Sequence, residues 1–72
     1  MKTWYWDFAG PTAEGTARHF RVHLDEFLAR EGISGCETGV ESLGPNHAAA
    51  FCRGPEAHAE AIERALRPRR SA

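Results

Sequence analysis

The sequence lacks three features that would mark common classes of protein: a long hydrophobic run, a leader segment and a high cysteine content. No apolar stretch in the 72 residues approaches the ~20 that span a membrane, so we expect no membrane segment. No basic start is followed by an apolar run, which predicts a cytoplasmic protein without a secretory signal. Two cysteines are too few for a disulfide scaffold. These absences leave one small globular domain.

The sequence also has few aromatic side chains and almost no net charge. Only 10% of the residues are aromatic, and the formal net charge is −1. The charge is this low because Arg67, Arg69 and Arg70 offset an acidic body. With a basic cluster confined to the tail, the sequence does not favour nucleic-acid binding. We expect a single domain over residues 1–67, followed by a basic flexible tail over 68–72.

The apolar pattern predicts five elements. They are a strand over 2–8, a helix over 12–31, a hairpin with strands over 36–43 and 47–53, and a second helix between Pro55 and Pro68. In the first strand Trp4, Trp6 and Phe8 alternate with polar residues and Tyr5, which is the period of a pleated strand. In the helices the apolar residues recur at helical spacing and form one stripe. Gly32 is placed to end the first helix.

The order β-α-β-β-α predicts an α+β fold in two layers. It corresponds to a ferredoxin-like fold without the final strand: a three-stranded sheet with two helices on one face. The crossover between the first two strands should be right-handed. In such a sheet the strand over 2–8 would be an edge.

The pattern over residues 3–66 resembles that of heavy-metal-associated domains. The likeness lies in a strand, a Gly-containing loop, a helix, a Gly-rich approach to a hairpin, and a second helix ending in Ala-Ile-Glu-Arg-Ala-Leu. The metal site of that family is a Cys-x-x-Cys motif in the loop after the first strand. Residues 9–16 contain no cysteine here, so the resemblance implies the architecture without that metal site.

The aromatic residues suggest the leading functional hypothesis, a small non-enzymatic binding module. An exposed apolar edge strand tends to pair with another chain, which predicts a homodimer or a protein partner. The residues expected to form the interface or a ligand pocket are Trp4, Tyr5, Trp6, Phe8, Phe51, His47 and His58.

Two alternatives rest on histidines. His19 and His23 are four residues apart on one helix face, a spacing that can chelate a divalent metal. A cofactor-free enzyme could instead use His47, His58 or Tyr5 as a general base. No catalytic set is recognisable in the sequence, which makes an enzyme the less favoured reading, and no cofactor other than such a metal is expected.

The two cysteines depend on the hairpin register. A three-residue loop, with Leu43 facing His47, puts Cys36 and Cys52 on one sheet face as diagonal neighbours. A two-residue loop puts them on opposite faces. Neither register pairs them directly, so we expect buried free thiols.

Overall fold

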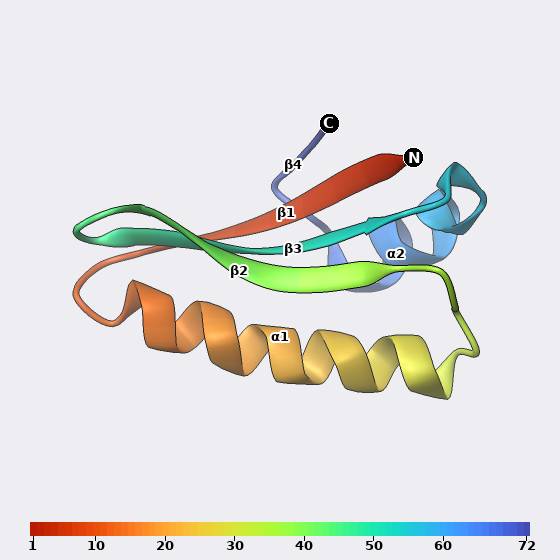
Figure 1. The fold of residues 1–72 in the computed structure, drawn as a ribbon, viewed down its shortest axis with the longest axis horizontal. Helices are drawn as coiled ribbons and strands as arrows, with labels where there is room; N and C mark the ends of the chain where they lie inside the picture. The colour runs from red at the N-terminus through yellow and green to blue at the C-terminus, as the bar shows by residue number, and fades with distance from the viewer.

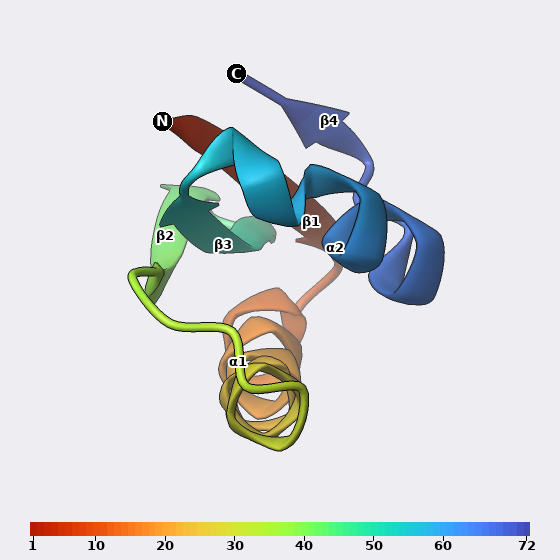
Figure 2. The same cartoon turned by 90° about the vertical axis from the view of Figure 1, so that its right-hand side faces the viewer.

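The chain folds in the order β-α-β-β-α-β, as this computed structural model describes over residues 1–72 (Figure 1). The elements are β1 (Lys2–Ala9), α1 (Ala13–Arg30), β2 (Glu37–Gly44), β3 (His47–Gly54), a 3-10 turn η1 (Glu56–His58), α2 (Ala59–Leu66) and β4 (Arg70–Ser71). The strands form one antiparallel sheet in the order β2-β3-β1-β4. Both helices lie on the same side of this sheet (Figure 2).

The helices begin and end close to the predicted positions. After α1, Gly32 adopts a φ of 68°, and the Ile33 amide donates to the Leu28 carbonyl at 2.9 Å. This bond closes the helix end and brings Ile33 onto the core. The second predicted helix divides into η1 and α2, and it ends before Pro68 as expected. Neither helix is both long and apolar enough to cross a membrane.

The β2–β3 hairpin combines the two loop lengths considered for it. Gly44 pairs with His47, which leaves Pro45 and Asn46 as a two-residue turn. The register then shifts between Ser42 and Gly44, and the extra residue, Leu43, forms a bulge. The remainder of β2 therefore has the register of the three-residue loop, with Thr38 opposite Cys52.

A fourth strand corrects the prediction of a three-stranded sheet. Arg67 ends α2 with a φ of 47°, and Pro68 cannot continue the helix, so the chain turns back along β1. Thr3 and Ala72 exchange backbone hydrogen bonds of 2.7 and 2.8 Å, and the Arg69 amide donates to the Tyr5 carbonyl. The prediction that β1 is an edge is also wrong, because β1 lies between β3 and β4. The flexibility expected for residues 68–72 stays a prediction.

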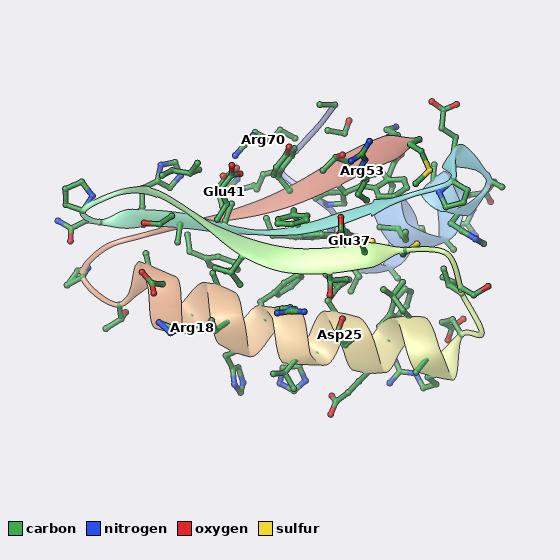
Figure 3. All side chains as sticks on the ribbon, viewed as in Figure 1. Arg18, Asp25, Glu37, Glu41, Arg53 and Arg70 are labelled. Atoms are coloured by element: carbon green, nitrogen blue, oxygen red, sulfur yellow. The ribbon has the colours of Figure 1, made fainter.

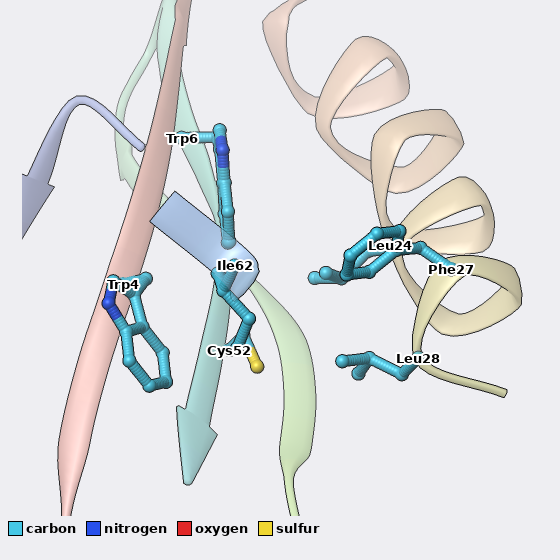
Figure 4. Close-up of a cluster of buried hydrophobic side chains, with 7 residues drawn as sticks. All are labelled: Trp4, Trp6, Leu24, Phe27, Leu28, Cys52 and Ile62. Carbon is cyan, nitrogen blue, oxygen red and sulfur yellow. The ribbon is translucent and has the colours of Figure 1, made fainter. Parts of the chain in front are cut away.

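The main core lies between the sheet and the two helices. Its seven buried side chains are Trp4, Trp6, Leu24, Phe27, Leu28, Cys52 and Ile62 (Figure 4). A smaller cluster joins Ala13 and Ala17 of α1 to Ala48 of β3. Alanines at these positions let α1 approach the sheet closely, so the abundant alanine of the sequence serves helix–sheet packing.

Candidate functional site

The sheet face turned away from the helices brings aromatic and charged side chains together. We call it the uncovered face and define it by Tyr5, Glu37, Glu41, Phe51, Arg53 and Arg70. Its four charged side chains lie on the side of the sheet opposite α1 (Figure 3). A shallow hollow of about 540 Å³ opens there, lined by Met1, Thr3, Tyr5, Glu37, Val40, Glu41, Phe51, Arg53 and Ala72.

Two aromatic rings occupy the middle of the uncovered face. Tyr5 and Phe51 are directly opposite each other on the two central strands, and both are half-buried. Gly39 is opposite Phe51 on the other side, and a Cβ atom on Gly39 would lie 2.6 Å from the ring. The Phe51 ring therefore lies over the bare backbone of Gly39, where no side chain separates the ring from the strand.

An ion pair joins β4 to β1 at the border of this face. Arg70 donates to both carboxylate oxygens of Asp7, with Nε to Oδ2 at 3.0 Å and Nη2 to Oδ1 at 2.9 Å. The guanidinium also lies 4.1 Å from the centre of the Tyr5 ring, within reach of a cation–π contact. Hydrogen bonds from Arg70 lower the pKa of the Asp7 carboxyl, and the charge of nearby His47 lowers it further. Asp7 is thus held ionised and Arg70 is held over Tyr5.

The charges of the uncovered face have both signs. Arg53 is opposite Glu37 across the β2–β3 ladder, while Glu41 lies further along β2. Together with the Arg70–Asp7 pair, no single sign dominates this surface. A surface of this kind can be complemented by another surface that itself carries both signs.

The structure separates the aromatic residues that the sequence had grouped. Trp4 and Trp6 are 0% and 5% exposed and belong to the core. The Trp4 indole donates to the Glu63 carboxylate at 2.8 Å, and the Trp6 indole donates to the Leu66 carbonyl at 2.9 Å. Both tryptophans therefore hold α2 against β1. Of the predicted aromatic set only Tyr5 and Phe51 reach the uncovered face, while Phe8 packs against Phe20 on the helix side.

The histidines lie in three separate places. His47 begins β3, with its Nε2 3.6 Å from Asp7 Oδ1. His58 ends η1 next to α2. Neither residue lines any of the three hollows of the molecule. His19 and His23 are brought together on α1, with their Nε2 atoms 3.1 Å apart. No cluster of three or more potential ligands exists for a metal.

The cysteines are free thiols that share one sheet face as diagonal neighbours. Burial raises the pKa of the Cys52 thiol to about 12, and the neighbouring Cys36 thiol adds to the rise. Cys52 is therefore protonated at neutral pH. It is neither a nucleophile nor a ready metal ligand in this state, since both roles require the thiolate.

Several residues of the uncovered face were missed from the sequence. Glu37, Glu41 and Arg53 share the strand parity of Tyr5 and Phe51 once the hairpin register is known, so a correct register could have found them. Arg70 offered no such signal, because its strand has only two residues.

Comparisons of this chain with protein-family models, with curated proteins and with solved structures find no match.

Proposed function

We propose that the chain is a non-enzymatic binding module whose uncovered face pairs with the same face of a second copy. The observation that carries the proposal is the Tyr5–Phe51 pair, two half-buried aromatic residues directly opposite each other on the central strands without a helix over them. Stacking two such faces would remove both rings from water, at roughly 25 cal/mol for each Å² of apolar surface buried. An apolar centre inside a charged border is the usual composition of a protein interface.

The distribution of charge supports a second copy as the occupant. The β2 edge of the uncovered face carries Glu37 and Glu41, and the β4 edge carries Arg70. These edges are the two outer strands of the sheet. A two-fold axis parallel to the strands would place Glu37 and Glu41 of each copy over the Arg70 side chain of the other. Self-complementary charge of this kind is what an isologous dimer requires.

The size of the face predicts a reversible dimer. Three strands spaced by about 4.8 Å and roughly 27 Å long give a flat area of about 400 Å². Stable interfaces bury about 800 Å² on each partner, including the sides of the side chains. We therefore expect monomer and dimer to exchange with concentration.

We propose further that the architecture is ferredoxin-like. The β-α-β-β-α-β order, the sheet order β2-β3-β1-β4 and the placement of both helices on one side support this assignment. In two-layer folds of this kind the second face of the sheet is free for a partner, which agrees with the proposed use of the uncovered face.

Sedimentation velocity across a concentration series tests the proposed dimer. We expect the wild-type chain to shift from monomer to dimer by tens of micromolar, and Tyr5→Ser and Phe51→Ser to stay monomeric while remaining folded by circular dichroism. Val22→Ser is the matched control, because Val22 is a 54% exposed apolar residue on α1. A wild-type chain that stays monomeric throughout, or a Val22→Ser variant that dissociates equally, would overturn the proposal.

Charge reversal tests the arrangement of the two copies. The double variant Glu37→Lys/Glu41→Lys should weaken association severalfold, since it would place like charges over the β4 edge of the second copy. The control Glu60→Lys changes a carboxylate of α2 that is 83% exposed and should leave association unchanged. Equal association of the double variant and the wild type would contradict the two-fold axis parallel to the strands.

A further inference from the structure

A pair of histidines on the outer side of α1 has the geometry of a metal chelate. His19 and His23 are exposed and lie one helical turn apart. The same helix packs its buried residues Leu24, Phe27 and Leu28 against the core, so the pair projects away from the sheet. This position is on the far side of α1 from the uncovered face, and the inference is therefore independent of the proposed dimer.

The distance between the two ring nitrogens fits a shared metal ion. His19 Nε2 and His23 Nε2 are 3.1 Å apart, and the rings are nearly perpendicular, with centres 4.6 Å apart. Two nitrogen ligands about 2.0–2.1 Å from one metal, at angles between 90° and 109°, are separated by about 2.9–3.4 Å. The two nitrogens already stand at the separation that one ion would impose.

A third residue sets the tautomer of His23. The Nδ1 atom of His23 lies 3.2 Å from the Glu26 carboxylate. A carboxylate only accepts hydrogen bonds, so it favours a proton on Nδ1 and leaves the lone pair of Nε2 directed at His19. A carboxylate behind a histidine ligand is the usual outer shell of a histidine–metal site, where it orients the ring and raises its basicity. Without metal, His19 satisfies this lone pair by donating its own Nε2 proton.

We propose that His19 and His23 chelate one divalent transition-metal ion through their Nε2 atoms, with Glu26 as the positioning residue. On binding, His19 keeps its proton but carries it on Nδ1, so that both Nε2 lone pairs face the ion. Water completes the coordination, since no third protein ligand is in the cluster. Two imidazoles select borderline ions, with Cu²⁺ bound more tightly than Ni²⁺ or Zn²⁺, and do not suit Mg²⁺ or Ca²⁺.

Calorimetric titration of the untagged chain with Ni²⁺ tests the site. We expect one ion per chain. Either His19→Ala or His23→Ala should weaken binding about tenfold or more, because a single imidazole loses the advantage of chelation. The matched controls His47→Ala and His58→Ala remove histidines that lie elsewhere and should bind as the wild type does. Glu26→Gln should weaken binding by a smaller factor, since it removes only the orienting charge.

A stability measurement separates chelation from adventitious binding. A metal that links residues one turn apart in the folded helix stabilises the folded state by mass action. Saturating Ni²⁺ should therefore raise the thermal midpoint of the wild type and of His47→Ala, and should not raise that of His23→Ala. His19, His23, Glu26 and His47 are exposed, so their variants should fold normally. Binding by His23→Ala within twofold of the wild type, or equal loss in His47→Ala, would overturn the proposal.

Discussion

Trp4 and Tyr5 are adjacent in the sequence, yet the pleat of β1 sends them to opposite faces of the sheet. Trp4 is fully buried beneath α2 and uses its indole N–H to bind Glu63. Tyr5 is half-buried, opposite Phe51 on β3 and with the Arg70 guanidinium 4.1 Å from the centre of its ring. The comparison teaches that the aromatic residues of β1 divide into two sets, one that stabilises the monomer and one that is left for association.

The largest effect on stability should come from truncating an aromatic side chain on the buried face of β1. Trp4→Ala removes a fully buried ring and its hydrogen bond, and should lower the free energy of unfolding by about 3–5 kcal/mol. Tyr5→Ala removes a half-buried ring and should cost about 1 kcal/mol or less in the monomer. Urea unfolding at low micromolar concentration, followed by circular dichroism, measures both.

A loss of 3–5 kcal/mol is close to the total stability expected for a small domain, so Trp4→Ala could remain unfolded. Trp4→Phe keeps a six-membered aromatic ring and removes the indole N–H together with the rest of the indole, which makes it the milder variant for the same comparison. If the Trp4 and Tyr5 variants lose the same free energy of unfolding, the two faces of β1 contribute equally to the stability of the monomer, contrary to this prediction.

The division between faces was readable from the sequence for β1, because period-two alternation separates Trp4 and Trp6 from Tyr5. It was not readable for the sheet as a whole. The bulge at Leu43 restores a register that the turn length alone would have reversed. A one-residue change of register moves every side chain of a strand to the other face, so Glu37 and Glu41 could not be placed.

The fourth strand escaped prediction for a different reason. A strand of two residues has no periodicity, and Arg69-Arg70-Ser71 reads as a polar tail. Its position depends on backbone hydrogen bonds to β1 and on the contact of Arg70 with Asp7, both of which join residues more than 60 positions apart. The role assigned to β1 as an edge followed from this omission, and so did the grouping of Trp4 and Trp6 with the interface.

Deleting residues 69–72 tests how much β4 contributes to both faces. The deletion removes the backbone hydrogen bonds that pair this segment with β1, among them two between Thr3 and Ala72 and one from Arg69 to Tyr5, and it removes the Arg70–Asp7 ion pair. At about 1 kcal/mol for each net backbone bond lost, we expect a loss of roughly 3 kcal/mol in unfolding free energy. Arg70→Ala is the control, because it keeps the backbone pairing and should cost less. A truncated chain as stable as the full chain would show that β4 does not stabilise β1.

A substitution within the uncovered face should have a smaller effect on folding than on association. In Gly39→Ala the new Cβ would meet the Phe51 ring at 2.6 Å and tilt the ring off the sheet. The ring can move outward, so we expect a loss of about 1 kcal/mol in stability together with severalfold weaker dimerisation. Gly15→Ala in α1 meets nothing within 4 Å and should instead raise stability by roughly 0.5–1 kcal/mol. If Gly39→Ala associates as the wild type does, the Phe51 ring is not part of the interface.

The smallest effect concerns the Asp7–Arg70 pair and depends on pH. Arg70 lowers the pKa of Asp7 in the folded state below its ordinary value of 3.8. A carboxyl whose pKa is lower in the folded than in the unfolded state adds stability above its unfolded pKa, and that stability is lost as the pH falls through 3.8 toward the folded value. The Arg70 side chain is 46% exposed, so the pair should contribute about 0.5–1 kcal/mol at pH 7.

The variant Asp7→Asn isolates this contribution. Glu63 also has a lowered pKa, because Lys2 and Trp4 donate hydrogen bonds to it, so the wild type alone would lose stability in acid for two reasons. Asp7→Asn keeps the pH-dependent stability that comes from Glu63 and removes the part that comes from Asp7. Unfolding curves of the two chains should differ at pH 7 and converge near pH 2–3. A constant difference across this range would mean that Asp7 acts through packing and not through its charge, and the β4 edge would then be held by its backbone bonds alone.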